Sequence, residues 1–290
     1  MLITPSLLHV KTRTGGDRRD DAVVLRSGQG ADRPVIDGLT ADAVLARLDA
    51  PVLRQGAEVT EWQCARDDHT AMAEAGEWND VLEALRFADQ DRTMASGGRR
   101  VASLISEGVR AGLTRALARQ AWPSARAELA RFEAVVEMHP EDYSAAHLLA
   151  QAHIDIGCAM QEAATRDQLK RDLSVESATH FEAAEDLLTI FDPIEEFSPL
   201  LAGTRYLLVR GIEDGRDLCR DWFEDWCDLD PFDADVHATH AVHMLPEWFG
   251  TLGGFEREAR RAAQMTQETT GKAAYAVFHM AAAKALGGMV

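Results

Sequence analysis

Apolar residues follow a helical period along most of the chain, from Thr60 onward. The segment from Glu61 to Glu74 predicts a helix that ends at Gly76. The apolar residues that follow fall at i, i+3, i+4, i+7 and i+10, the spacing of one buried helix face: Trp78, Val81, Leu82, Leu85 and Ala88. Pro123 occupies a first-turn position of a further helix. The pattern therefore predicts an all-α protein whose helices cover most of residues 60–285.

The first 58 residues have a different pattern, in which glycines, prolines and charged residues interrupt short apolar runs. Two of these runs, Ala22 to Leu25 and Pro34 to Ile36, are short and β-like. A third segment, Thr40 to Leu48, predicts a short helix with Thr40 as its N-cap. We therefore expect an irregular N-terminal arm at 1–58, with short strands or a helix, and an α-helical domain at 59–290.

Internal repetition is the strongest sign of organisation. Three segments align without gaps, at residues 139–153, 192–206 and 230–244. Each has a proline after a helix, then a short acidic stretch, then a new apolar helix. A small residue follows each proline by ten positions: Ala150, Gly203 and Ala241. Because a partner helix can cross closely only at a small side chain, we expect all three to be buried at helix crossings.

These segments resemble tetratricopeptide repeats, which combine a small residue in the first helix, a turn glycine, a following aromatic residue and a terminal proline. Tyr206 matches the aromatic position. The turn and terminal matches are Gly76 with Trp78, Gly157, Gly253 with Phe255, and Pro140, Pro193 and Pro231. The proline spacings of 53 and 38 residues depart from a steady repeat of about 34, so lengthened helices or an insertion are expected at 160–179.

The resemblance covers roughly residues 60–270 and implies a stack of antiparallel helical hairpins. It implies no activity, because such repeats are a scaffold without shared chemistry. A second resemblance lies at His243 to Gly250, which is similar to a helix-end motif in a group of tetratricopeptide-like bacterial proteins that share no agreed activity. The strong preference for Arg over Lys also indicates a GC-rich bacterial genome.

Charge narrows the choice of partner. The chain has 30 basic and 48 acidic residues and a net charge of −18. Such a surface repels nucleic-acid phosphates and anionic lipids, so neither nucleic acid nor a membrane is expected to bind. A basic protein or peptide is the more natural partner. The chain shows no signal peptide and no long uncharged apolar run, so we expect a cytoplasmic protein.

Three histidines provide the main candidate for chemistry. His237, His240 and His243 are spaced three apart, so neighbouring rings share a face if the segment is helical. His237 and His240 could bind one metal ion, with Asp233 as a third ligand. No second metal motif accompanies them. The favoured interpretation is that two rings pack between helices while the third reaches solvent, and no cofactor is expected.

Aromatic residues give candidates for partner binding. Trp222, Phe223, Trp226 and Leu229 lie at helical spacing, which is typical of core packing and compatible with an aromatic wall for a peptide. The candidate contact residues are Trp222, Trp226, His243 and Trp248. The four cysteines have no C-x-x-C spacing and are expected to be reduced and mostly buried: Cys64, Cys158, Cys219 and Cys227.

The favoured function is a non-catalytic module that binds a protein or peptide. One alternative is a metal-binding protein or enzyme that uses the row of His237, His240 and His243. Another is a self-assembling structural protein in which the N-terminal arm is exchanged between subunits.

Overall fold

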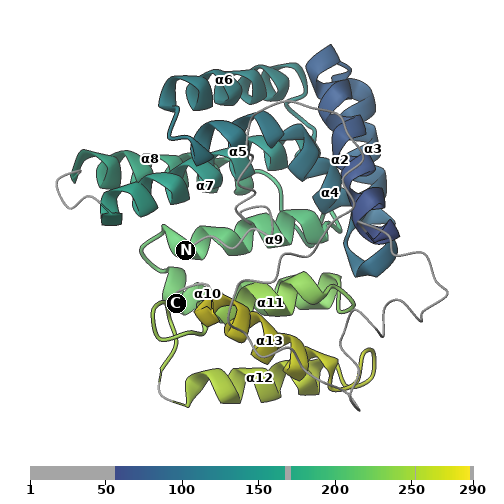
Figure 1. The fold of residues 1–290 in the computed structure, drawn as a ribbon, viewed down its shortest axis with the longest axis vertical. Coiled ribbons are helices and arrows are strands. Elements are labelled where there is room, and N and C mark those ends of the chain that lie inside the picture. Colours follow the sequence, from purple (N-terminus) through teal and green to yellow (C-terminus); the bar gives the residue numbers. More distant parts are fainter. Residues whose placement is uncertain (1–55, 167–170, 252, 288–290) are drawn as a thin grey trace, which may run out of the picture.

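The structure, a computed structural model, describes residues 56–166, 171–251 and 253–287, and most of these residues are helical (Figure 1). The α-helices are α2 (Ala57–Ala75), α3 (Trp78–Gln90), α4 (Val101–Val109), α5 (Ala111–Ala118), α6 (Trp122–Met138), α7 (Tyr143–Arg166), α8 (Arg171–Leu188), α9 (Pro199–Leu207), α10 (Gly215–Leu229), α11 (Ala234–His243), α12 (Gly254–Met265) and α13 (Ala273–Gly287). Short 3₁₀ turns are η2 (Ser96–Gly98) and η3 (Leu208–Arg210).

These helices confirm the predicted all-α class. Within the described ranges, the only β-type pairing is an isolated bridge between Met94 and Arg100. The predicted arm at 1–58 lies almost entirely outside the described residues, and α2 begins at Ala57. No helix in those ranges combines the length and the apolar character that crossing a bilayer requires.

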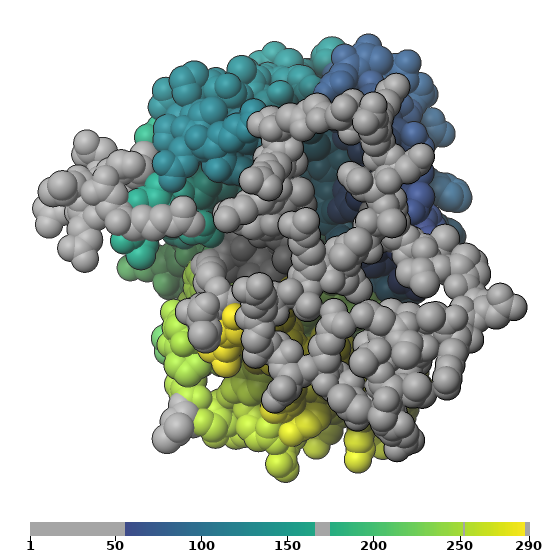
Figure 2. Space-filling model, in the orientation of Figure 1, coloured from purple at the N-terminus to yellow at the C-terminus, as the bar shows by residue number. Residues whose placement is uncertain are grey.

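Apolar side chains gather in three larger clusters along the long axis of the molecule. The first cluster includes residues from α2 through α7, and the second includes residues from α9 through α13. The third lies between them and is formed by α7, α8 and α9. Figure 2 shows the early helices in blue and teal at one end and the yellow C-terminal helices at the other. The helix α9 therefore connects the two ends, since it contributes to both the middle and the C-terminal cluster.

The pair α7 and α8 accounts for the irregular repeat spacing. At 24 residues, α7 is the longest helix of the described chain, which agrees with the lengthening expected near residues 160–179. The prediction for Gly157 is wrong, because this glycine lies inside α7 and not in a turn. A Cβ atom at Gly157 would lie 2.8 Å from the ring of Phe181 on α8. Its missing side chain therefore allows α8 to approach, which a local sequence pattern cannot distinguish from a turn.

The repeat positions are buried as predicted. Ala150 and Ala241 are fully buried on α7 and α11, and Gly203 is buried on α9. A Cβ atom at Gly203 would lie 2.8 Å from Cζ2 of Trp226 on the neighbouring helix α10. Gly76 and Gly253 also stand at helix ends, with left-handed φ angles of 77° and 70°.

The three terminal prolines lie in the loops that precede α7, α9 and α11. Each of these helices thus begins after a loop that contains the proline, and each buries a small residue ten positions after that proline. Whether the hairpins stack with the geometry of a tetratricopeptide solenoid stays a prediction.

A buried carboxylate joins three helices near these loops. Asp89, in the last turn of α3, accepts hydrogen bonds from Tyr143 Oη (3.1 Å), the backbone N–H of Leu200 (2.9 Å) and the Ser198 hydroxyl. Ser198 is also the N-cap of α9 and accepts from the Leu201 N–H. Burial raises the pKa of Asp89, and its hydrogen bonds oppose that shift. One side chain therefore fixes the starts of α7 and α9 against the end of α3.

Gly203 gives a direct test of the helix crossing. Replacing Gly203 with Leu should lower the free energy of unfolding by about 1–3 kcal/mol, because the new side chain overlaps the Trp226 ring. Gly287→Leu is the matched control, since an added Cβ at that exposed position meets nothing within 4 Å. Urea unfolding measures both variants. Equal stability of the Gly203 variant and wild type would contradict the α9–α10 crossing.

Candidate functional site

The histidine row lies on α11, as the sequence predicts, but its burial differs from the prediction. Asp233 caps the helix by accepting a hydrogen bond from the Asp235 N–H at 2.9 Å. His237, His240 and His243 are exposed by only 3%, 1% and 3%. The expectation that one ring reaches solvent is therefore wrong. All three rings are packed, because α9, α10 and α13 supply aromatic side chains around α11.

A tyrosine hydroxyl from α9 organises two of the three rings. Tyr206 Oη lies 2.8 Å from His240 Nδ1 and 3.0 Å from His243 Nδ1. The Cys219 thiol approaches the same hydroxyl at 3.3 Å. Since a hydroxyl has one hydrogen to donate, it can donate to one imidazole and must accept from another donor.

The position of Glu258 suggests which tautomer each ring holds. His240 Nε2 faces Glu258 Oε2 at 3.8 Å, which favours a proton on Nε2 and leaves Nδ1 as an acceptor. Tyr206 then donates to His240, and the Nδ1–H of His243 donates to Tyr206. The arrangement is a directed chain from His243 through Tyr206 to His240 that orients these two rings, and His237 lies outside it.

Burial keeps these groups uncharged. Desolvation lowers the pKa of His237 to about 4, and it also lowers the pKa values of His240 and His243. Desolvation raises the pKa of Tyr206 well above its ordinary value. Neutral imidazoles and a protonated tyrosine suit packing, since each can be buried without an ion partner.

His237 differs from its neighbours because neither ring nitrogen has a hydrogen-bond partner. Its ring meets the edges or faces of Phe223 and Phe278, with centroids 5.8 and 6.4 Å away. The described residues contain no group of three or more His, Cys, Asp or Glu side chains arranged to hold a metal ion. A metal on His237 and His240 stays a prediction, without a third ligand among those residues.

The aromatic candidates divide into buried and surface residues. Trp226 lies in the core against Gly203, and His243 is enclosed, so neither can be a direct contact for a partner. Trp222 and Trp248 are half-buried. Arginine guanidinium groups cover both rings: Arg205 lies 5.6 Å from the Trp222 centroid, and Arg210 lies 4.6 Å from that of Trp248.

The cysteines agree with the expectation of free, mostly buried thiols. Cys158, Cys219 and Cys227 are buried and Cys64 is exposed. Burial raises the pKa of each of the three buried thiols to about 11, so they are protonated and poorly nucleophilic.

Sequence reasoning missed a second buried polar network, on α7. The His147 ring contacts Ser106 Oγ of α4 and Thr204 Oγ1 of α9, both at 2.8 Å. About two turns further along α7, Asp155 pairs with Arg110, the residue between α4 and α5, and accepts a hydrogen bond from Gln151 at 3.1 Å. The signal that could have found it is a polar stripe at spacings of three and four inside an apolar helix: Ser144, His147, Gln151 and Asp155.

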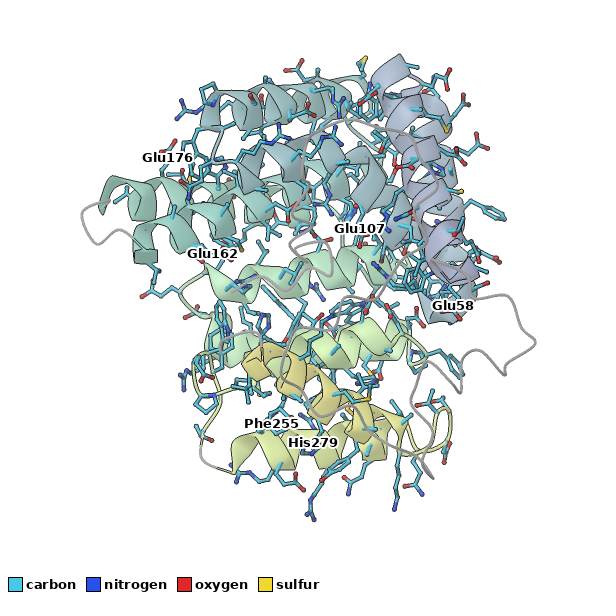
Figure 3. All side chains as sticks on the ribbon, viewed as in Figure 1. Glu58, Glu107, Glu162, Glu176, Phe255 and His279 are labelled. Atoms are coloured by element: carbon cyan, nitrogen blue, oxygen red, sulfur yellow. The ribbon has the colours of Figure 1, made fainter. Side chains whose placement is uncertain are left out.

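Charged pairs also hold the N-terminal helices together. Glu107, labelled in Figure 3, pairs with Arg66 of α2 and with Arg99 in the turn before α4. At the other end of the molecule, Figure 3 shows Phe255 and His279 on α12 and α13, and their ring centroids are 5.3 Å apart.

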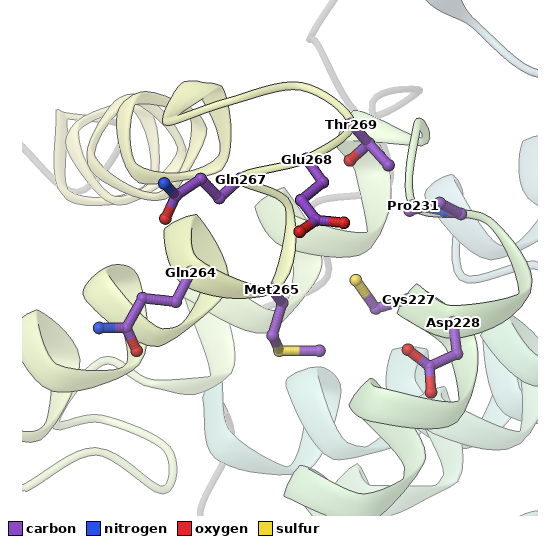
Figure 4. A pocket seen from close by; sticks show the side chains of 8 residues that line it. All are labelled: Cys227, Asp228, Pro231, Gln264, Met265, Gln267, Glu268 and Thr269. Atoms are coloured by element: carbon purple, nitrogen blue, oxygen red, sulfur yellow. The ribbon is translucent and has the colours of Figure 1, made fainter.

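Two surface pockets accompany these features, and neither is lined by the histidine row. One, of about 470 Å³, lies between the end of α10 and the segment after α12 (Figure 4); its lining includes Cys227, Asp228, Gln264 and Glu268. The other, of about 480 Å³, lies between α3, the loop before α7 and Glu196. The face of α11 with His237 and His240 therefore packs against neighbouring helices, and it opens onto neither pocket.

Comparison with protein-family models, with curated proteins and with solved structures finds no match to this chain. The resemblance to tetratricopeptide repeats thus rests on the residues of the chain itself.

The lowered pKa of His237 predicts a pH effect on stability. Because folding favours the neutral ring, the contribution of His237 is complete above its unfolded pKa of 6.5 and is lost as pH falls toward about 4. His237→Phe keeps an aromatic ring and removes the titration. Over that pH interval, the stability of the variant should fall less steeply than that of wild type, by up to about 1.4 kcal/mol per pH unit.

Urea unfolding from neutral pH to about pH 4.5 measures this difference. The buried carboxylate of Asp233, whose pKa burial and Asp235 raise to about 7, is present in both proteins and does not affect the comparison. His279→Phe, at a ring with a 44% exposed side chain, is the control. Parallel pH profiles for the His237 variant and wild type would show that this ring is protonated freely in the folded protein.

Proposed function

We propose that this chain is a non-catalytic, tetratricopeptide-like helical repeat module that binds a protein or peptide. The observation that carries the proposal is the recurrence of one local unit. Each of α7, α9 and α11 follows a proline loop and buries a small residue ten positions after the proline. Stacked helical units of this kind bury a continuous core and leave an extended surface for a partner.

The charge of the surface supports a basic partner. The acidic stretches at 182–196 and 213–230 are mostly exposed, and Asp230 is their buried exception, paired with Arg100. Like charges repel and opposite charges attract over the range of the screening length, so a surface of this sign accelerates association with a cationic partner.

The histidine row supports this proposal better than it supports an enzyme. Its rings are enclosed and burial favours their neutral forms; Tyr206 orients His240 and His243, and Phe223 and Phe278 pack against His237. An acid or base in catalysis must reach a substrate proton, and these rings line neither described pocket. The arm at 1–58 lies almost entirely outside the described residues, so self-assembly through an exchanged arm stays a prediction.

Partner capture from the native cell lysate, followed by reconstitution with the purified partner, tests the proposal. The association rate should fall as salt is raised, because ions screen the attraction of a chain with net charge −18. The dissociation rate should change much less. An association rate that is the same at low and high salt would remove the electrostatic part of the proposal, and the absence of any reconstituted partner would count against the binding role.

A further inference from the structure

Half of the large apolar side chains that the described chain exposes belong to three segments of the fold. Of the ten large apolar residues that the described chain exposes, five lie near the end of α3, at the end of α6 or in the loop before α9: Phe87, Met138, Ile190, Ile194 and Phe197. Phe87, Met138 and Phe197 are exposed by 68%, 59% and 60%. Exposed apolar residues scattered singly need no explanation, whereas a group of them marks a binding surface.

A pocket is lined by residues of the same segments. It has a volume of about 480 Å³, and its lining includes Arg86 and Gln90 of α3, the loop residues His139 to Tyr143, and Glu196. Phe87, Met138 and Phe197 each adjoin a lining residue in sequence. We call this pocket together with Phe87, Met138 and Phe197 the loop-edge surface. A volume of this size accepts several side chains of a bound peptide.

Two of the three non-glycine residues with positive φ in the described chain contact each other here, and the third, Gln120, lies between α5 and α6. Arg92 and Phe197 have φ angles of 51° and 54°, a region that side chains larger than Gly rarely adopt. The Arg92 guanidinium lies 4.1 Å from the Phe197 ring centroid, and the next residue, Ser198, is held by Asp89. The surrounding contacts therefore keep an exposed phenyl ring on a strained backbone, a combination that is common at functional sites.

The charge around this surface is negative. The segments that form it carry seven carboxylates: Asp91, Glu137, Glu141, Asp142, Asp192, Glu195 and Glu196. The basic groups beside them are Arg86, Arg92 and Arg205, of which Arg205 pairs with Asp192 at 3.9 Å. Arg86 is paired with Asp142, and Arg92 donates to the carbonyls of Leu229 and Gln90. The guanidinium groups of Arg86 and Arg92 are thus already bonded to other groups of the protein. Exposed carboxylates such as Glu141 and Glu195 remain available to a cationic partner.

We propose that the loop-edge surface binds a basic amphipathic protein segment, whose apolar side chains pack on Phe87, Met138 and Phe197 and whose Lys or Arg side chains meet the surrounding carboxylates. This inference rests on the proposed binding function and specifies where the partner binds and what chemistry it has. An isologous contact with a second copy of this chain is disfavoured, because it would bring two acidic surfaces together.

Selection from a random peptide library displayed on phage, with the full chain as bait, tests this inference. We expect wild-type protein to enrich peptides in which Lys or Arg alternates with apolar residues at helical spacing. Phe87→Ser combined with Met138→Ser should weaken binding of a synthetic enriched peptide by about tenfold or more. The matched control is Val175→Ser combined with Met280→Ser, which removes side chains that are 70% and 71% exposed elsewhere.

A second pair of variants tests the charge. Glu141→Gln combined with Glu195→Gln should weaken binding about threefold and reduce its dependence on salt. Asp217→Asn combined with Asp221→Asn, at exposed positions on α10, should leave binding close to wild type. Circular dichroism of all four variants confirms that each remains folded.

The outcomes separate the two proposals. Enriched peptides that are not basic, or that bind the loop-edge variants as tightly as wild type, would overturn this inference and leave a binding module. No enrichment by wild type would count against both the inference and the binding function. A wild-type dimer that the Phe87→Ser and Met138→Ser changes convert to a monomer would also overturn the inference, because the surface would then bind a second copy.

Discussion

Asp89 accepts hydrogen bonds from three sites that lie far from it in sequence, and much of the arrangement of helices depends on this buried carboxylate. It holds Tyr143 at the start of α7 and both Ser198 and Leu200 at the start of α9. A buried carboxylate is costly unless hydrogen bonds compensate its lost hydration, so the donors are required as much as the acceptor. The contact fixes the helix starts and, through Ser198, the loop that presents Phe197.

The polar residues inside the protein act mainly on orientation. Tyr206 fixes the orientation of two imidazole rings on α11, and His147 links α4, α7 and α9 through its hydrogen bonds. Each group remains neutral, so it can be buried without a counter-ion, and each bond favours one helix register over others. The proposed binding surface consists of different residues, near the helix starts that these contacts hold in place. These buried hydrogen bonds therefore position the surface residues, although the bonded groups themselves are not exposed.

Sequence periodicity predicted the helices, the shared helix of the three histidines and the burial of Gly203, because these depend on local spacing. It misassigned Gly157, because a glycine that admits Phe181 from another helix has the same local pattern as a turn glycine. It placed one histidine in solvent, because the groups that cover His243 come from α9 and from the loop after α11. No local sequence pattern indicated the role of Asp89, because its hydrogen-bond partners are 54 to 111 residues away along the chain.

Native-state hydrogen exchange on Asp89→Ala tests most directly whether this carboxylate couples three helices. The account predicts that the variant loses about 2–4 kcal/mol of stability, because Tyr143 Oη, Ser198 Oγ and the Leu200 N–H lose their acceptor together. Amide protection should fall at the starts of α7 and α9 as well as in α3, whereas Asp91→Ala, at an exposed position just after α3, should behave as wild type. Protection lost in α3 alone, or stability equal to wild type, would contradict the account.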